Sequence, residues 1–167
     1  MGTEHVKFGV RLLDDLGGVR DLVALGQLAE QLGFDSLWCP NGLFRLNSWV
    51  LDAALAQATS RIGLFAGTNV YTTDPAEIAT FLATLDDIAQ GRASVSIGLH
   101  NTDTITWVGM HGSDVLQRVR EATDIVRRLL RGEVVAYGGQ VYRWTEKAYL
   151  RVKPYRADVP ILICPVG

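Results

Sequence analysis

A histidine and an asparagine stand side by side where a short apolar run ends, a place where a side chain could take part in chemistry. His100 and Asn101 follow the run 93–99. An imidazole changes its charge near neutral pH, so His100 could donate or accept a proton, while Asn101 could only hydrogen-bond. Alternatively, His100 is an ordinary loop residue in contact with water. The other histidines, His5 and His111, do not complete the spacing of a metal-binding motif, so we expect no metal site.

The segment before His100 reads as strand, helix, strand. The apolar run 62–66 is too short for a helix, and a polar turn follows it. Asp74 is suited to cap a helix that begins with Pro75, and Gly91 ends the apolar periodicity of that helix. The run 93–99 is again typical of a strand. These features predict one βαβ unit of a parallel sheet.

The same alternation continues along the whole chain. We expect further strands at 6–12, 35–39 and from Pro160 onward, and helices at 19–32, at 49–58 after Asn47 or Ser48, and after Ser113 or Asp114 up to Gly132. The segment 134–144 alternates around Gly138 and Gly139, which predicts a β-hairpin. Strict alternation requires a parallel sheet covered by helices, either a doubly wound sheet or a TIM barrel. The segment 13–18 lacks the glycine pattern of a dinucleotide-binding fold.

Composition excludes several classes of partner. The 167 residues include 16 basic and 18 acidic side chains, which leaves no general attraction to nucleic acid or acidic lipid. No run approaches the roughly 20 apolar residues that span a bilayer, and the N-terminus does not resemble a signal peptide. We therefore expect a cytoplasmic domain that acts on a small molecule. Cys39 and Cys164 are expected to be buried thiols, and the four tryptophans to pack in the core or at an interface.

One basic segment is expected to be structural. The helix that follows Asp114 carries several arginines interleaved with Glu121 and Asp124. Asp124 and Arg128 are spaced for a favourable helical ion pair. We therefore predict that this is a solvated outer face and not a binding site.

Five segments in order resemble the luciferase-like monooxygenase superfamily, most closely its deazaflavin-dependent branch of the methylenetetrahydromethanopterin reductase type. They are GFDSLWCPN at 33–41, ATSRIGLFAGTNVYTTDPAEIA at 58–79, LATLDDIAQGRASVSIGL at 82–99, RVREATDIVRRLLRGEVVAYGGQVY at 118–142 and VPILICPVG at 159–167. The resemblance covers nearly the whole chain. It implies the α/β fold of the N-terminal part of a TIM (β/α)8 barrel, with about five parallel strands, and residues 1–167 forming a single partial domain.

The resemblance also implies what is missing. Family members are about twice as long, so the strands that would follow the fifth are absent from this sequence. The first and fifth strands would then have unpaired edges. We expect either a truncated gene product, or a homo-oligomer or partner chain that completes the barrel.

By resemblance, the cofactor is FMN or a deazaflavin (coenzyme F420), bound at the carboxyl ends of the strands. The positions that match the family's cofactor site are Asn41, Gly67, Thr68, Asn69, Tyr71, Gly98 and Gly167. Asn41 and Gly42 stand where the family often has Asp-His, so a proton-transfer group is absent there. The family also has a non-prolyl cis peptide, which would fall at Gly67–Thr68 or Ala66–Gly67. Asn41 could equally be a plain turn residue, and Asn69 and Tyr71 ordinary loop residues.

The implied function is that of a flavin- or deazaflavin-dependent oxidoreductase, which transfers a hydride or activates oxygen. The ring would carry out the redox step, while His100 and Asn101 polarise or orient the substrate. An alternative of another class is a non-catalytic binding or assembly subunit that needs a partner chain, and a truncated product fits the same sequence.

Overall fold

The chain alternates strands and helices from end to end. The computed structural model describes residues 6–99, 102–110 and 113–164. Its elements are β1 (Gly9–Arg11), the 3-10 turn η1 (Asp14–Leu16), α1 (Val19–Gln31), β2 (Ser36–Cys39), α2 (Ser48–Ala58), β3 (Gly63–Asn69), α3 (Pro75–Ile88), β4 (Ala93–Gly98), α4 (Thr102–Trp107), α5 (Val115–Leu130), β5 (Val135–Gly138), β6 (Arg143–Ala148) and β7 (Ile161–Cys164).

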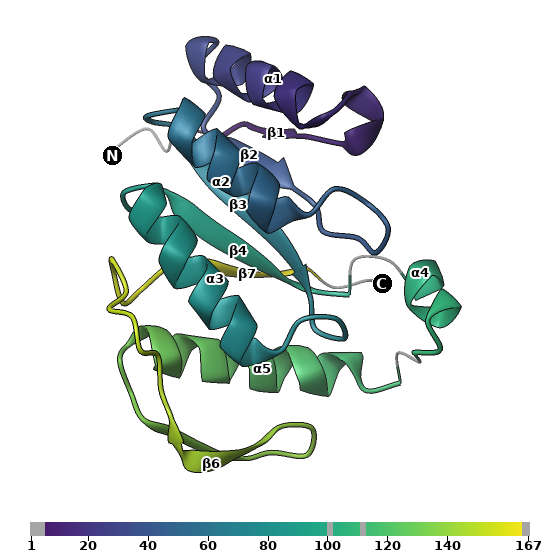
Figure 1. The fold of residues 1–167 in the computed structure, drawn as a ribbon, viewed down its shortest axis with the longest axis vertical. Helices are drawn as coiled ribbons and strands as arrows, with labels where there is room; N and C mark the ends of the chain where they lie inside the picture. Colours follow the sequence, from purple (N-terminus) through teal and green to yellow (C-terminus); the bar gives the residue numbers. More distant parts are fainter. Residues whose placement is uncertain (1–5, 100–101, 111–112, 165–167) are drawn as a thin grey trace.

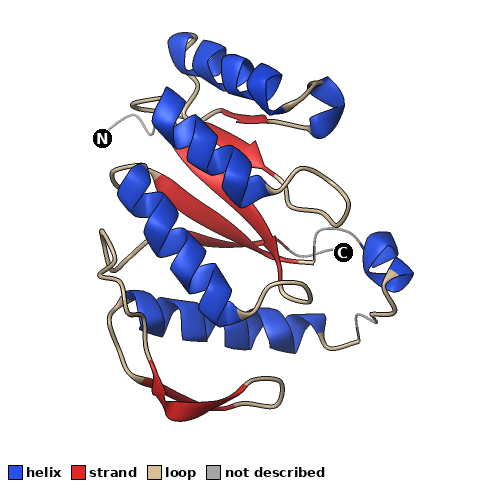
Figure 2. Ribbon diagram, in the orientation of Figure 1, coloured by secondary structure: helices blue, strands red, loops and turns tan. Residues whose placement is uncertain are grey.

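Five of the strands form one parallel sheet in the order β1-β2-β3-β4-β7. The helices α1, α2, α3 and α5 lie in a row along one face of this sheet, each packed on the next (Figure 1). β5 and β6 form a separate antiparallel hairpin beside α5 (Figure 2). The predicted parallel sheet, its covering helices and the hairpin are therefore confirmed.

The sequence signals around α3 act as expected. The Asp74 carboxylate accepts a hydrogen bond from the backbone N–H of Ala76 at 2.8 Å, and Pro75 is the first helical residue. Ile78 and Leu82 are fully buried against the sheet, and Gly91 adopts a left-handed φ of 83° just past the helix. A capped helix with one apolar face thus covers the sheet here.

Three elements differ from the prediction. β1 pairs with β2 only over Gly9–Arg11, because the N–H of the preceding Phe8 donates to the Asp35 side chain at 2.8 Å and not to the backbone of β2. β3 extends to Asn69, three residues beyond the predicted strand, because β4 offers it pairing partners as far as Gly98. The short helix α4 was not predicted, since six residues are too few to show a clear helical periodicity.

The amino ends of the strands are tied together by buried and half-buried ionic groups. The Arg92 guanidinium donates to the carbonyls of Ala56, Thr59 and Ile62 at 2.9–3.1 Å. Asp86 is fully buried and pairs with Arg156, with 2.9 Å between Oδ2 and Nε. This edge of the sheet is therefore fastened by contacts between distant segments.

The face of the sheet opposite the helices carries a different set of side chains. Arg11, Trp38, Phe65 and Ser94 lie in one row across β1 to β4. The Arg11 guanidinium stacks 4.7 Å from the centre of the Trp38 ring. No helix in the described part of the chain covers this row (Figure 1). In a closed barrel, this face would be the interior.

Candidate functional site

The carboxyl ends of β2, β3 and β4 bring together most of the predicted cofactor residues. Asn41 follows β2, while Gly67, Thr68 and Asn69 end β3, Tyr71 comes directly after it, and Gly98 ends β4. Ligands of parallel α/β sheets bind at this edge. Gly167 and the predicted catalytic residues His100 and Asn101 lie outside the described residues, so their roles stay predictions.

Gly67 is where the loop after β2 crosses β3. A β-carbon added to Gly67 would lie 2.7 Å from the backbone nitrogen of Asn41 and 3.1 Å from the Cα of Pro40. On the other side, the Ser48 hydroxyl donates a 2.8 Å hydrogen bond to the Gly67 carbonyl. Gly67 therefore allows the Asn41 loop to lie close to β3.

Thr68 and Asn69 point to opposite faces of the sheet. Thr68 shares the helix-facing side with Leu64 and Ala66, is fully buried, and its hydroxyl has no hydrogen-bond partner in the described part of the chain. Asn69 lies on the face away from the helices, and its side-chain oxygen accepts the backbone N–H of Tyr71 at 2.9 Å. Asn69 is 4% exposed and Thr68 fully buried, so little of either side chain is exposed to a ligand.

Gly98 is a second position of close approach. A β-carbon there would lie 2.1 Å from the Cys164 carbonyl oxygen at the end of β7. Gly98 also accepts the backbone N–H of Val70 at 3.2 Å. The predicted cofactor glycine therefore lets β7 pair closely with β4.

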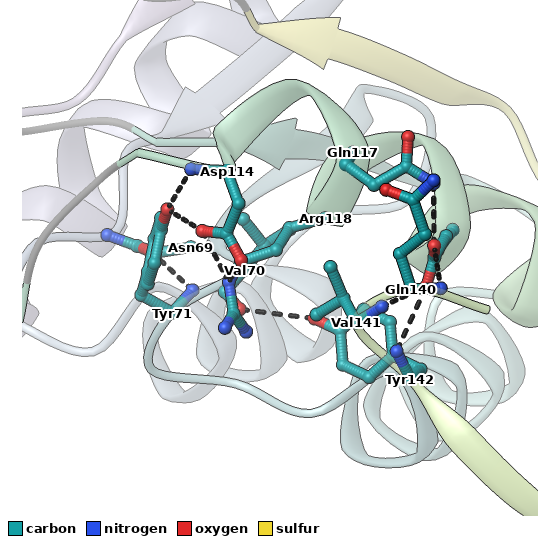
Figure 3. Close-up of polar contacts among 10 residues, drawn as sticks. Asn69, Val70, Tyr71, Asp114, Gln117, Arg118, Gln140, Val141 and Tyr142 are labelled. Atoms are coloured by element: carbon teal, nitrogen blue, oxygen red, sulfur yellow. Dashed lines mark hydrogen bonds and ion pairs between the residues drawn. The ribbon is translucent and has the colours of Figure 1, made fainter.

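Tyr71 is anchored to the first turn of α5 (Figure 3). Its hydroxyl donates a short hydrogen bond to the Asp114 carboxylate, 43 residues along the chain. The same carboxylate pairs with Arg118 at 2.9 Å, and the Arg118 guanidinium lies 4.7 Å from the centre of the Tyr71 ring. Asp114 precedes α5 as predicted, but its side chain holds Tyr71 and Arg118 and does not cap the helix.

The charges in this cluster are mutually stabilised. Burial alone would raise the pKa of Asp114, but hydrogen bonds from Tyr71 and Arg118 outweigh it and lower that pKa below its ordinary value. Burial, together with the bond to Asp114, raises the pKa of the Tyr71 phenol. Tyr71 is therefore a neutral donor to an ionised Asp114, and the pair fixes the loop after β3.

A second contact from α5 to the hairpin continues this network (Figure 3). Glu121 is buried, and its carboxylate accepts backbone N–H groups of Gln140, Val141 and Tyr142 at 2.8–3.1 Å. The Tyr142 hydroxyl in turn donates to the Val70 carbonyl at 3.3 Å. The prediction that Glu121 belongs to a solvated face is wrong, because three consecutive backbone donors replace its hydration.

The predicted ion pair on the same helix also differs. Arg128 pairs with Glu133, with 2.8 Å between Nε and Oε2. Glu133 lies beyond the helix end, so helical spacing could not show this partner. Of the two cysteines, Cys39 is buried as predicted, whereas Cys164 is only half-buried.

Asp52 is a buried acid directly behind the carboxyl end of β2. It is fully inaccessible on the sheet-facing side of α2, and neither of its oxygens has a hydrogen-bond partner among the described residues. Burial raises its pKa to about 8, and a weak interaction with the Cys39 thiol, outside hydrogen-bond geometry, only partly opposes this. Asp52 is therefore largely protonated at neutral pH. Burial raises the pKa of the Cys39 thiol, and the neighbouring Asp52 raises it further, so this thiol is not a nucleophile.

The expected cis peptide is not found. All peptide bonds of the described residues are trans, including Ala66–Gly67 and Gly67–Thr68. The reason lies in the ladder, because Gly67, Thr68 and Asn69 pair one by one with Ser96, Ile97 and Gly98. This part of the implied site is therefore wrong for the structure.

Two further properties concern metal and membrane. Among the described residues, no group of three His, Cys, Asp or Glu side chains is placed to hold a metal ion. Within the same residues, no helix has both the length and the apolar character needed to cross a bilayer.

The donor set fits a flavin or deazaflavin ring better than a charged ligand. Asn41 is half-buried, and its amide can both donate and accept hydrogen bonds. The pyrimidine edge of such a ring presents carbonyl acceptors and an N–H donor. The contacts of Asp114 and Glu121 were missed by the analysis of the sequence, because their partners Tyr71 and Gln140 lie 43 and 19 residues away.

Comparison with known proteins supports the resemblance. Residues 6–166 match the family model described as luciferase-like monooxygenase. A 5,10-methylenetetrahydromethanopterin reductase of Archaeoglobus fulgidus is 33% identical over 163 residues, covering 97% of this chain and 48% of the relative. An F420-dependent glucose-6-phosphate dehydrogenase of Microbacterium testaceum is 30% identical over 180 residues, covering 99% and 52%.

The fold comparison agrees. The solved structure of a coenzyme F420 dependent tetrahydromethanopterin reductase from Methanopyrus kandleri superposes with a TM-score of 0.85 at 25% identity, covering 95% of this chain and 50% of that chain. The structural neighbours are TIM barrels, so the five-stranded sheet corresponds to the expected part of such a barrel. The chain spans about half the length of the relatives it matches.

Proposed function

This chain belongs to the luciferase-like monooxygenase family, and we propose that it forms part of an oxidoreductase that uses a deazaflavin (coenzyme F420) or FMN. The relatives reported above include F420-dependent enzymes with two different substrates, so the cofactor is the feature they share. Residues 1–167 would form one partial barrel domain. Its location in the cytoplasm stays a prediction.

The observation that carries this proposal is the meeting of Asn41, Gly67 and Asn69 at one edge of the sheet. The ring, when bound, supplies hydride transfer or oxygen activation. The amides of Asn41 and Asn69 would hold its polar edge, and the Tyr71–Asp114 contact would keep the loop after β3 in position. Gly98 and Gly167 complete the proposed cofactor contacts. His100 and Asn101 would orient the substrate.

A titration of the 167-residue chain with the deazaflavin, followed by fluorescence and with FMN as competitor, tests the proposal. Saturable binding is expected, and Asn41→Ala should weaken it about three- to tenfold, as expected for the loss of one or two hydrogen bonds. Gln57→Ala, an exposed position on α2, is the matched control and should bind as the unaltered chain does. A folded chain that binds neither cofactor would contradict the proposal.

A second candidate is a non-catalytic binding or assembly subunit that pairs with another chain. The outer edges of β1 and β7 favour it, since each strand pairs on one side only within the described sheet. Asn41 and Gly42 also supply no group that titrates. Co-purification of a chain that brings the remaining barrel strands, without any cofactor binding by the pair, would favour this candidate over the oxidoreductase.

A further inference from the structure

Two exposed aromatic rings meet beyond the carboxyl ends of the strands. Phe44 lies in the loop after β2, and Trp107 is the last residue of α4. Their ring centres are 5.9 Å apart, with 33° between the ring planes. Phe44 is 72% exposed and Trp107 is 71% exposed, so each ring leaves most of its surface in water. Trp107 is thus not in the core, one of the two places expected for the tryptophans, and the other, an interface, stays a prediction.

The position of this pair follows from the order of the strands. β3 lies between β2 and β4 in the sheet. A contact between the loop after β2 and a helix after β4 must therefore cross the end of β3, where Asn69 and Tyr71 lie. Figure 1 shows α4 beyond the tips of the strands, beside the loop that follows β2. The two rings consequently lie beyond the strand ends that carry the proposed cofactor residues.

The loop holds Phe44 outward at a conformational cost. Phe44 has a φ of 64°, a left-handed conformation that residues with a β-carbon adopt rarely. The next residue, Arg45, pairs with Asp14 at 2.9 Å, and the Asn47 side chain accepts the Val50 N–H at 3.2 Å as the cap of α2. These contacts fix the loop on the side that leads into α2. Neither local preference nor burial accounts for the place of the Phe44 ring, whereas a ligand that covers it would.

We propose that Phe44 and Trp107 form an aromatic clamp that binds a flat aromatic or heteroaromatic ring of the substrate beside the cofactor. This inference rests on the proposed function, because it names the substrate class of the same site. Two tilted aromatic faces favour a planar ring through stacking and edge-to-face contacts, which a saturated ring of equal size cannot make. Two side chains alone are too few for a protein interface, which typically takes about 20–30 residues a side.

Binding of 2-naphthoate to the full chain, measured by calorimetry, tests the clamp without any turnover. Decahydro-2-naphthoate is the matched probe, with the same charge but saturated, non-planar rings. The planar probe should bind about tenfold or more tightly than the saturated one, and Phe44→Ala or Trp107→Ala should each weaken it about three- to tenfold. Phe44→Tyr and Trp107→Phe should retain binding. Tyr149→Ala removes an exposed aromatic ring elsewhere and should change nothing.

The outcomes separate the clamp from the proposed function. Equal affinity for the two probes, no binding of 2-naphthoate, or unchanged binding in both alanine variants would each overturn the clamp. The same variants are titrated with the deazaflavin, whose affinity should stay within about twofold, because the rings contact the substrate side of the site. Selective binding of 2-naphthoate by a chain that binds neither deazaflavin nor FMN would refute the proposed function and leave the clamp standing.

Discussion

At the scale of single residues, the carboxyl edge contains groups that oppose folding as well as groups that support it. Asp52 is an acid buried with no hydrogen-bond partner in the described chain, and Phe44 is held in a left-handed backbone conformation. Such features cluster at functional sites, where the surrounding structure over-determines them. The amino edge, by contrast, pairs its buried charges completely, as Asp86 and Arg156 show.

Asp52 should make the chain less stable as pH rises. Its pKa is raised from 3.8 in the unfolded chain to about 8 in the folded one, so its protonated form favours folding. The contribution of protonated Asp52 to the free energy of unfolding is therefore fully present below pH 4. Above pH 4 the free energy of unfolding falls by up to about 1.4 kcal/mol per pH unit until pH 8. The side chain of the Asp52→Asn variant cannot ionise. The free energy of unfolding of this variant, relative to that of the unaltered chain, should therefore rise from pH 4 to pH 8.

Urea unfolding at several pH values measures this difference. Asp87→Asn changes an exposed carboxylate on α3 and is the matched control, which should keep the pH dependence of the unaltered chain. If Asp52→Asn followed the same curve as the unaltered chain, Asp52 would have to be ionised in the folded state.

Gly67 and Gly98 should tolerate no side chain. Gly67→Ala would press on the Asn41 backbone, and Gly98→Ala on the Cys164 carbonyl, so each should lower the free energy of unfolding by about 1–3 kcal/mol. Gly138→Ala is the matched control, because open space surrounds that position. Thermal melts of the three variants check this, and wild-type stability in Gly67→Ala would show that the Asn41 loop does not cross β3 as described.

At the scale of elements, the helices and strands were predictable because their signals are local. Asp74, Pro75 and Gly91 mark the ends of α3, and the alternation around Gly138 marks the hairpin. The extension of β3 was not predictable, since it depends on pairing with β4 and not on the residues of β3 themselves.

The candidate site was predictable in its place but not in its contacts. Asn41, Gly67 and Asn69 gather as expected, because strands of a parallel sheet share one carboxyl edge. The Tyr71–Asp114 hydrogen bond and the Phe44–Trp107 contact join segments that are distant in sequence. Nothing in the local sequence around these four residues indicates that they are partners.

The hairpin should depend on one carboxylate. Burial would raise the pKa of Glu121, but hydrogen bonds from Gln117 and from the backbone of Tyr142, Gln140 and Val141 lower it below the ordinary value. Glu121→Gln replaces one acceptor oxygen by a donor and should cost about 2–3 kcal/mol at neutral pH. The cost should shrink below pH 4.5, because the carboxylate's advantage is lost as it becomes protonated.

Glu133→Gln provides the comparison. Glu133 pairs with Arg128 at the surface, so its loss should cost less than about 1 kcal/mol. Hydrogen exchange of the Gln140–Tyr142 amides reports directly on the hairpin. Equal effects of the two substitutions, or unchanged exchange in Glu121→Gln, would mean that Glu121 does not hold the hairpin on α5.

At the scale of the whole molecule, the described residues form a sheet that is covered on one face and has no pairing strand at either outer edge. The helices lie along one side, while the row from Arg11 to Ser94 faces away from them (Figure 1). Leu162 and Ile163 of β7 are each 49% exposed, and Phe8 beside β1 is exposed as well. Unpaired strand edges with apolar side chains favour pairing with another chain.

We therefore expect the 18.3 kDa chain to associate, and β7 to be the strand through which it does so. Sedimentation equilibrium should give an average mass above that of one chain at micromolar concentration. Leu162→Lys places a charge on the face opposite the helices, next to the unpaired edge. A lysine buried in the contact would lose its hydration, so association should shift to at least about tenfold higher concentration. Leu116→Lys, at an exposed position on α5, is the control for added charge. A chain that sediments as a monomer at every concentration would show that the open edges do not by themselves drive assembly. If Leu116→Lys weakened association as much as Leu162→Lys, the contact would lie away from β7.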